Sequence, residues 1–210
     1  MSRSAAAVRQ VIKAYDVRGL VGEEIDEGFV ADVGAAFARL VRDEAAAGST
    51  RVAIGYDMRE SSPTLAAAFA DGVTAQGLDV VRIGLASTDQ LYFASGFLDC
   101  PGAMFTASHN PAAYNGIKLC RAGAKPVGKD TGLTVISDDV IAGVPDYDGA
   151  RGSVSERDVL ADYGDFLRSL VDVGGQCTLK VAVDAGNGMA GHTTPAVLGV
   201  IPSITLSPLY

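Results

Sequence analysis

The sequence predicts an α/β fold: a three-layer α/β/α domain with a mixed sheet, followed by an incomplete second domain of the same type. Segments with apolar residues at helical spacing alternate with short apolar runs, which is the pattern of layered α/β domains. Two such runs flank one tight polar loop near residue 108, which requires at least one antiparallel strand pair. Hydrophobic residues make up 48% of the 210 residues, enough for one core and part of a second.

The elements of the first half follow from the apolar pattern in order. A helix is predicted over residues 26–47, because its apolar residues fall on one face and Gly48 ends it. A strand over residues 51–57 comes next, and then a helix that carries Leu65, Phe69 and Val73 and ends at Gly77. The rest of this half is a strand over residues 80–83, a short helix over residues 90–98 behind the Ser87-Thr88 cap, and the two strands around residue 108.

A second domain is predicted to begin after residue 145. Glycine, proline and polar residues crowd residues 143–155, which favours a linker and divides the chain into residues 1–145 and 146–210. Beyond it the pattern predicts a helix over residues 155–172 with Ser155 as its cap, then a strand, a helix and a strand over residues 180–184, 188–198 and 201–206. These elements are too few to close a layered fold, so we expect the chain to be an N-terminal fragment.

Charge and composition exclude several classes of function. Seventeen Lys and Arg residues against 25 Asp and Glu residues give a net charge of −8 without any basic run, so no nucleic-acid partner is expected. No run of 18 apolar residues exists, so no membrane span is expected. Cys100, Cys120 and Cys177 have unrelated spacings and an odd count. This argues against a metal motif or a disulfide framework and favours a reducing cytoplasm.

The loop Thr106–Pro111 carries the most chemistry. It reads Thr-Ala-Ser-His-Asn-Pro, and the next strand returns through Asn115–Lys118. A hydroxyl on a rigid loop with a nearby ammonium suits a group that carries phosphate, with Ser108 as acceptor and Lys118 neutralising charge or moving a proton. Two other interpretations are a serine that caps a turn and a hydrolase nucleophile with His109 as base. Neighbouring side chains point apart on an extended backbone, and no Gly-x-Ser-x-Gly elbow is present, which disfavours the hydrolase.

Four stretches in order carry a resemblance to a known family. Besides the serine loop they are Tyr15–Gly19, Gly55–Arg59 with the two serines that follow it, and Val183–Gly188. Together they resemble the α-D-phosphohexomutase superfamily, at spacings similar to those of its bacterial phosphomannomutase/phosphoglucomutase branch. The resemblance covers nearly the whole chain.

The resemblance implies a reaction and a set of site residues. Ser108 would carry a phosphoryl group that moves on and off a hexose phosphate. The 1- and 6-phosphates of mannose or glucose would interconvert through a hexose 1,6-bisphosphate. Lys118 would be a general acid/base, with a further catalytic role for His109. The residues that would bind the substrate or its phosphate are Tyr15 and Arg18, in an early loop, and Asn110. Asp57 and Arg59 are expected to pair beneath the site.

The resemblance also implies Mg²⁺, held by the phosphate on Ser108 and by three aspartates of an Asp-Gly-Asp-x-Asp loop. That aspartate loop is absent from this sequence. The nearest segment, Asp146–Arg151, has two aspartates and is interpreted as a solvated linker. Without the metal ligands and the family's C-terminal phosphate-binding loop, the chain alone is expected to be inactive.

Three alternatives stay open. Lys118 would be an ordinary surface lysine, the commonest fate of this residue. Gly186–Gly191 matches Gly-x-Gly-x-x-Gly after a predicted strand, which is typical of a dinucleotide site, but no carboxylate follows about 20 residues later. Finally, the chain would be a non-catalytic phosphosugar-binding or regulatory remnant that kept the serine loop.

Overall fold

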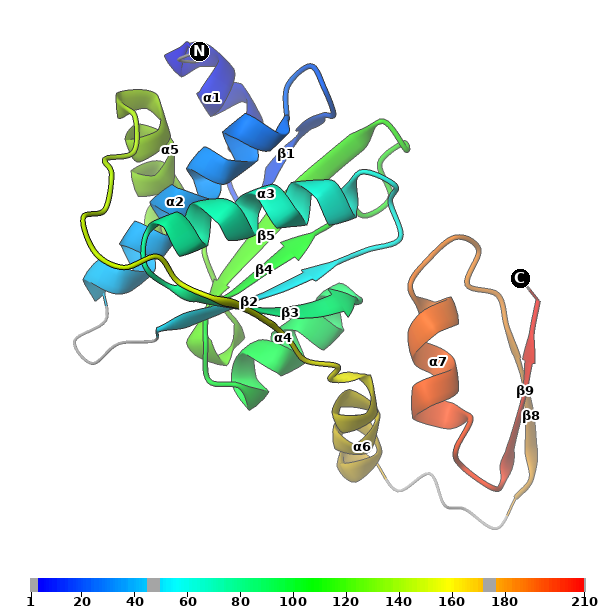
Figure 1. Ribbon diagram of the computed structural model, residues 1–210. Helices are drawn as coiled ribbons and strands as arrows, with labels where there is room; N and C mark the ends of the chain where they lie inside the picture. Colours follow the sequence, from blue (N-terminus) through cyan, green and yellow to red (C-terminus); the bar gives the residue numbers. More distant parts are fainter. Residues whose placement is uncertain (1–3, 45–49, 172–176, 210) are drawn as a thin grey trace.

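The computed structural model describes residues 4–44, 50–171 and 177–209, and it confirms the three-layer α/β/α fold with a mixed sheet (Figure 1). Among these residues, seven strands form the main sheet in the order β1-β5-β4-β2-β3-β7, with β6 paired to β5. The strands are β1 Val17–Leu20, β2 Arg51–Tyr56, β3 Asp79–Leu85, β4 Gly102–Phe105, β5 Tyr114–Arg121, β6 Lys125–Pro126 and β7 Val154–Glu156.

The direction of the strands places the serine loop. Strands β4, β2, β3 and β7 are parallel, whereas β5 runs antiparallel to both β4 and β1. The predicted antiparallel pair is confirmed, since Phe105 of β4 lies opposite Ile117 of β5. The loop between them therefore lies at the carboxyl ends of the parallel strands, the edge where open α/β sheets bind their ligands.

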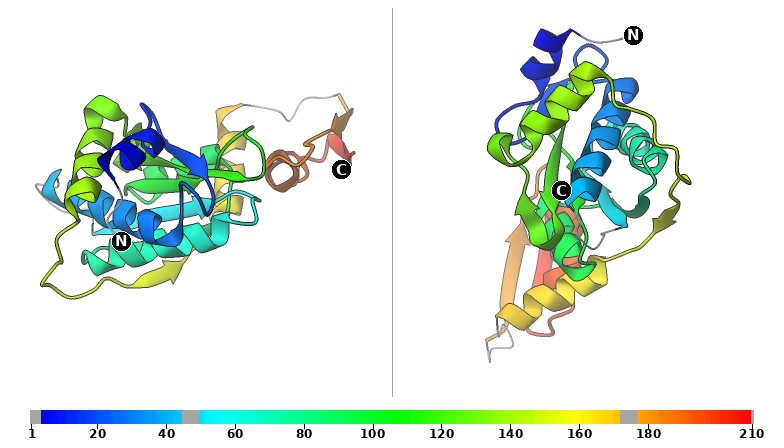
Figure 2. Two further views of the ribbon diagram at one scale, coloured as in Figure 1. Left: turned by 90° about the horizontal axis from the view of Figure 1, so that it is seen from above. Right: turned by 90° about the vertical axis from the view of Figure 1, so that its left-hand side faces the viewer.

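Helices cover both faces of the sheet. On one face lie α1 Ala5–Val11, α2 Glu27–Glu44, α3 Ser62–Ala75 and α5 Leu133–Ala142. Of these, α5 contacts both α1 and α2 (Figure 2). Their apolar residues share one buried cluster with Ile54 and Phe105 of the sheet. On the other face α4 Thr88–Phe97 buries Leu91 and Ala94 against Met104, with Val159 beside them. The two cores make this part of the molecule a layered unit.

Most elements predicted for the first half are confirmed. The helices predicted at 26–47 and 90–98 are α2 and α4, and Ser87 caps α4 by accepting a hydrogen bond from the Gln90 N–H. The helix that carries Leu65 is α3. The pattern did not predict α1, β1, α5, β6 or the short 3₁₀ turns Ala122–Ala124 and Lys129–Thr131.

The predicted helix over residues 155–172 begins too early. Val154–Glu156 is strand β7, which extends the sheet beside β3, and the Ser155 hydroxyl donates to the Val80 carbonyl instead of capping a helix. Helix α6 spans Leu160–Leu170, and the Asp158 carboxylate accepts a hydrogen bond from the Leu160 N–H at its start. Residue 172 lies outside the described residues.

The end of the chain forms a smaller unit. Strands β8 Leu179–Val183 and β9 Ile204–Pro208 are parallel, and α7 Ala190–Leu198 connects them. Helix α7 contacts α6, where Arg168 donates to the carbonyls of Ala196 and Val197. The domain division at residue 145 stays a prediction, and β7 shows that the main sheet takes one strand from beyond it.

Two observations concern the membrane span and the disulfide framework that the sequence argued against. Within the described ranges, no helix combines the length and the apolar character that crossing a bilayer requires. Cys100, Cys120 and Cys177 are free thiols, and burial raises the pKa of Cys100 to about 11.

Helices α2 and α3 approach each other through glycine. A Cβ atom on Gly72 would lie 2.0 Å from the Ala31 carbonyl oxygen, and one on Gly34 would lie 2.4 Å from the Phe69 carbonyl oxygen. No side chain fits at either position unless the helices move apart. Both helices pack on the same core, so this contact fixes the distance between α2 and α3 on the face of the sheet that they cover.

Gly72→Ala is therefore expected to destabilise the fold by about 1–3 kcal/mol, the cost of overpacking a close contact. Denaturant unfolding followed by circular dichroism measures this change. Gly96→Ala in α4 is the matched control, because open space surrounds Gly96. It should leave the protein as stable as the wild type or more stable by up to about 1 kcal/mol. Equal stability of Gly72→Ala and the wild type would contradict the close contact.

Candidate active site at the serine loop

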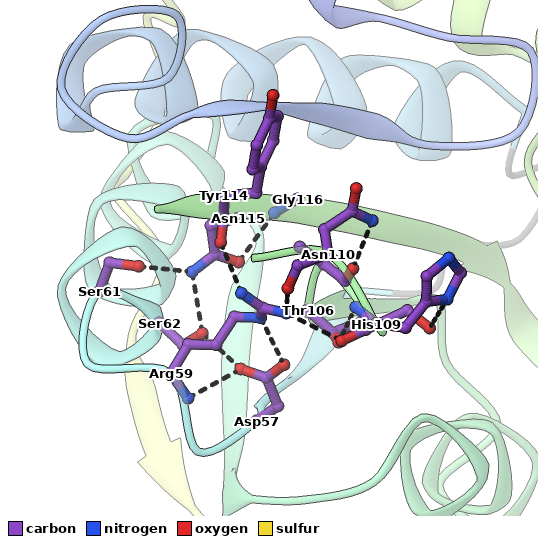
Figure 3. A network of polar contacts seen from close by, with 12 residues as sticks. Asp57, Arg59, Ser61, Ser62, Thr106, His109, Asn110, Tyr114, Asn115 and Gly116 are labelled. Atoms are coloured by element: carbon purple, nitrogen blue, oxygen red, sulfur yellow. Dashed lines mark hydrogen bonds and ion pairs between the residues drawn. The ribbon is translucent and has the colours of Figure 1, made fainter. Parts of the chain in front are cut away.

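The serine loop is a tight turn at the carboxyl end of β4 (Figure 3). Ser108 is exposed and has φ +54°, a left-handed conformation that L-residues other than glycine adopt at a cost. Its backbone N–H donates to Thr106 Oγ1 at 3.0 Å. Asn110 holds the turn from the other side, since its backbone N–H and its Nδ2 both donate to the Ala107 carbonyl, at 3.1 and 2.8 Å. The loop therefore presents the Ser108 hydroxyl to solvent.

Arg59 holds the loop from beneath. Its Nη1 donates to the carbonyls of Pro111 and Tyr114, both at 2.9 Å. Its Nη2 donates to the carbonyls of Ser108 and Asn110, at 2.8 and 2.7 Å. The Arg59 side chain is only 9% exposed. One guanidinium thus binds three carbonyls of the serine loop and the carbonyl of Tyr114, the first residue of β5, and fixes the path of the backbone through the turn.

Asp57 orients this arginine. Its Oδ2 lies 3.3 Å from Arg59 Nε. Its Oδ1 accepts hydrogen bonds from the backbone N–H of Arg59 and from the Ser62 hydroxyl. The expected pairing of Asp57 with Arg59 beneath the site is confirmed. The amide of Asn115 then donates to the hydroxyls of Ser61 and Ser62, which joins β5 to the same network (Figure 3).

His109 lies nearer to Ser108 than the sequence argument expects. Its Nδ1 is 3.4 Å from Ser108 Oγ. The expectation that the two side chains point apart assumed an extended backbone, and the positive φ of Ser108 removes that condition. Ser108, His109 and Asn110 are therefore brought together in one turn.

Arg18 and Lys118 form a second group with Asp16. Arg18 lies on strand β1 and not in an early loop, because β1 pairs with β5 over Val17–Leu20. Arg18 Nη2 donates to Asp16 Oδ2, and Lys118 Nζ lies 3.8 Å from the same oxygen. The strand was missed because its four residues have no strand pattern of their own.

Tyr15 lies outside these two groups, and Lys118, in the second group, lies on the strand that returns from the serine loop. Tyr15 precedes β1 and is 81% exposed. Lys118 lies opposite Met104 in the β4–β5 pair, two residues before Thr106. Within the described residues, no hydrogen bond or ion pair joins Lys118 to Ser108. The proximity of these two side chains stays a prediction.

In the part of the chain that the structure describes, no group of three or more His, Cys, Asp or Glu side chains could hold a metal ion. The segment Asp146–Arg151 is an exposed coil in which the Tyr147 ring lies 4.5 Å from the Arg42 guanidinium carbon.

The glycine motif after strand β8 forms a tight strand-to-helix turn. The Asp184 carboxylate accepts a hydrogen bond from the Gly186 N–H, and Gly186 has φ +49°, a conformation that suits such a turn.

The left-handed conformation of Ser108 predicts an unusual order of stability. Ser108→Gly is expected to be more stable than Ser108→Ala by about 1 kcal/mol, because glycine adopts this conformation without steric cost. At Ser169, in helix α6, the order should reverse, with alanine favoured by up to about 1 kcal/mol. Denaturant unfolding of the four variants tests this, and the same order at both positions would contradict the conformation of Ser108.

The support by Arg59 predicts that lysine cannot replace it. Arg59→Lys keeps the charge but cannot reach four carbonyls, so losing even one charged hydrogen bond should cost about 1.5–3 kcal/mol. Arg39→Lys is the control, since Arg39 makes one partly exposed ion pair with Asp139, and should cost less than about 1 kcal/mol. Thermal unfolding of both variants measures the difference. Equal losses would show that the loop does not depend on Arg59.

Comparison with known proteins identifies what the chain is similar to. It is 38% identical over 188 residues to a phosphomannomutase of Salmonella montevideo, covering 88% of this chain and 40% of that protein. It is 39% identical over 180 residues to a protein of Xanthomonas campestris pv. campestris named phosphohexose mutases, covering 85% and 39%. The chain thus spans about 40% of the length of these curated relatives.

A solved structure and a family model agree with these relatives. The crystal structure of a phosphoglucomutase/phosphomannomutase family protein from Burkholderia thailandensis superposes with a TM-score of 0.83 at 30% identity, covering 95% of this chain and 43% of that one. The family model described as phosphoglucomutase/phosphomannomutase, alpha/beta/alpha domain I, matches residues 9–140. These residues are more than half of the chain and contain both the serine loop and its arginine support, and the chain belongs to the phosphoglucomutase/phosphomannomutase family.

Proposed function

We propose that the whole protein is a phosphohexomutase, which interconverts the 1- and 6-phosphates of mannose or glucose through a phosphoserine at Ser108 and a hexose 1,6-bisphosphate. The observation that carries the proposal is the exposed Ser108 hydroxyl on a turn whose backbone Arg59 holds by four hydrogen bonds. A nucleophile fixed on a rigid turn gives up little freedom when the reaction begins.

The proposed reaction moves one phosphoryl group in each direction. The bond between phosphorus and Ser108 Oγ breaks as a bond forms to a free hydroxyl oxygen of the sugar phosphate. The proton of that hydroxyl passes to a base, the role proposed for Lys118, with His109 beside the serine as a second group able to move protons. Ser108 Oγ leaves with the electrons of the broken bond and takes up a proton. In the second transfer Ser108 Oγ gives up that proton as it attacks the other phosphoryl group of the bisphosphate, and the sugar oxygen that is released takes up a proton. This leaves the isomeric hexose phosphate and the phosphoserine.

One positive and two neutral polar groups would hold the phosphate during transfer. The Arg18 guanidinium, which can bind two phosphate oxygens, is proposed to bind the phosphate together with Tyr15 and the Asn110 amide. Such groups supply most of the rate enhancement in phosphoryl transfer, because they hold the reactants in line and stabilise the transferred charge.

Mg²⁺ is proposed for the whole protein from the family's metal dependence. A phosphate on Ser108 would provide oxygen ligands, but the described residues place no carboxylate cluster beside it. The donor set described here therefore does not hold a divalent cation, and no step above is assigned to one. The cytoplasmic location inferred from the cysteines likewise stays a prediction.

Phosphopeptide mapping tests the function directly. The whole protein, incubated with glucose 1,6-bisphosphate, is expected to carry one phosphoryl group on Ser108 and to convert glucose 1-phosphate or mannose 1-phosphate to the 6-phosphate. Ser108→Ala should abolish both the label and the turnover. Ser169→Ala, which removes an exposed hydroxyl from helix α6, should change neither.

Other outcomes assign other functions. Label on a different serine, with Ser108 unmodified, would refute the mechanism. Binding of hexose phosphate without any phosphorylation or turnover would identify a non-catalytic phosphosugar-binding protein.

A further inference from the structure

The cluster of Asp16, Arg18 and Lys118 contains a carboxylate to which the proposed reaction gives no role. Strands β1 and β5 are antiparallel, with Val17 opposite Ile117 and Arg18 opposite Gly116. Continued by one residue, this register places Asp16 across from Lys118. Asp16 precedes β1 by one residue, and its carboxylate lies on the same side of the sheet as the Arg18 guanidinium, because the two side chains are hydrogen-bonded.

One oxygen of Asp16 contacts both cations. Asp16 is only 7% exposed, and its Oδ2 accepts a hydrogen bond from Arg18 Nη2 while lying 3.8 Å from Lys118 Nζ. A buried carboxylate requires such partners, because its loss of hydration is otherwise uncompensated. Equally, two cations held this close together repel unless a negative charge lies between them.

The two cations keep donors for a further anion. Their side chains are 31% and 30% exposed, so neither is fully used by the fold. Arg18 Nε is buried and has no hydrogen-bond partner. A guanidinium has five N–H donors, and the hydrogen bond to Asp16 uses one of them.

Backbone hydrogen bonds connect this cluster to the nucleophile. Gly116 lies opposite Arg18, and its carbonyl accepts a hydrogen bond from the Thr106 N–H at 3.0 Å. Thr106 in turn holds the Ser108 N–H through its hydroxyl. Lys118 thus lies on β5, one of the two strands that carry the serine loop, and Arg18 lies on β1, which pairs with β5.

We propose that Asp16 is a positioning residue for phosphoryl transfer, an inference that rests on the proposed phosphohexomutase function. Its carboxylate holds Arg18 and Lys118 in one arrangement and reduces their joint charge from +2 to +1. Holding the lysine favours the transfer step. A joint charge of +1 binds the substrate phosphate less tightly in the ground state than a joint charge of +2 would. More of the binding energy is then available to stabilise the transition state.

Asp16→Asn separates these effects, because it keeps the shape of the side chain and removes its charge. In the whole protein, kcat for hexose 1-phosphate is expected to fall by about 10²-fold, the scale of a small misplacement of reacting groups. KM should stay equal or fall, since two uncompensated cations bind phosphate at least as tightly. A purely structural role would lower the amount of folded enzyme without this divergence of kcat and KM.

Two control variants sharpen the comparison. Asp16→Glu restores the carboxylate on a longer side chain and should recover part of kcat. Asp139→Asn removes the partly exposed Arg39–Asp139 ion pair, whose atoms are 3.2 Å apart, and should leave both kinetic constants unchanged.

A second measurement does not depend on turnover. Acetylation of Lys118, followed by mass spectrometry with exposed Lys129 as internal reference, should be several times faster in Asp16→Asn. In that variant the Lys118 ammonium loses its ion pair with the Asp16 oxygen that lies 3.8 Å from Nζ, so the side chain is freer to reach the reagent.

The outcomes are distinct. An unchanged kcat in Asp16→Asn, a KM that rises in proportion to the loss, or unchanged labelling of Lys118 would overturn the role of Asp16. A wild-type protein without turnover or Ser108 phosphorylation would refute the proposed function instead, and the labelling comparison would then decide whether Asp16 holds Lys118.

Discussion

The hydrogen bonds from Arg59 to the serine loop are the interaction on which the candidate site depends. A guanidinium this far from water must find partners for its N–H groups, and three loop carbonyls and the Tyr114 carbonyl accept hydrogen bonds from its two Nη groups. Asp57 offsets its charge, and the Ser62 hydroxyl and the Asn115 amide extend the support to α3 and β5. The loop thus takes its shape from a side chain 49 residues or more away in sequence. The connection between β2 and α3, which carries Arg59, thus sets the position of Ser108 together with the loop itself.

The sequence predicted those elements whose signal is local. The apolar face of α2, the apolar spacing of α3 and the Ser87 cap of α4 each depend on residues within one turn or a few turns of one another. Strand β1 has no such signal, because the pairing that makes it a strand comes from β5, about 100 residues later. Ser155 was misread for a related reason. A serine before an apolar segment can cap a helix or lie in an edge strand, and here the Val80 carbonyl of a distant strand decides.

The features of the candidate site likewise divide into those that the sequence predicted and those that depend on contacts between distant residues. Motif order identified Ser108 and its neighbours, and the pairing of Asp57 with Arg59 was expected from the motif that contains both. The role of Arg59 was not foreseen, because sequence spacing says nothing about which carbonyls a guanidinium reaches across the fold. The Ser108–His109 contact was misjudged, since the left-handed backbone of Ser108 arises from the turn and its supports. A serine in the sequence does not indicate a positive φ, whereas a glycine at position 108 would have indicated one.

Strand β7 has a consequence for how the molecule behaves in solution. An unpaired β3 would present a row of free N–H and C=O groups, which can template pairing with another chain. Hydrogen bonds fix the segment before β7. Gln76 donates to the Pro145 carbonyl, and Ser153 donates two hydrogen bonds to the Asp79 carboxylate. The hydrogen bonds from Ser153 lower the pKa of the Asp79 carboxyl. The segment thereby delivers three residues that cover this edge. The new edge is short and ends at charged Glu156, so it offers little surface for a further strand. The connection out of the first sheet thus also protects that sheet from edge-to-edge aggregation.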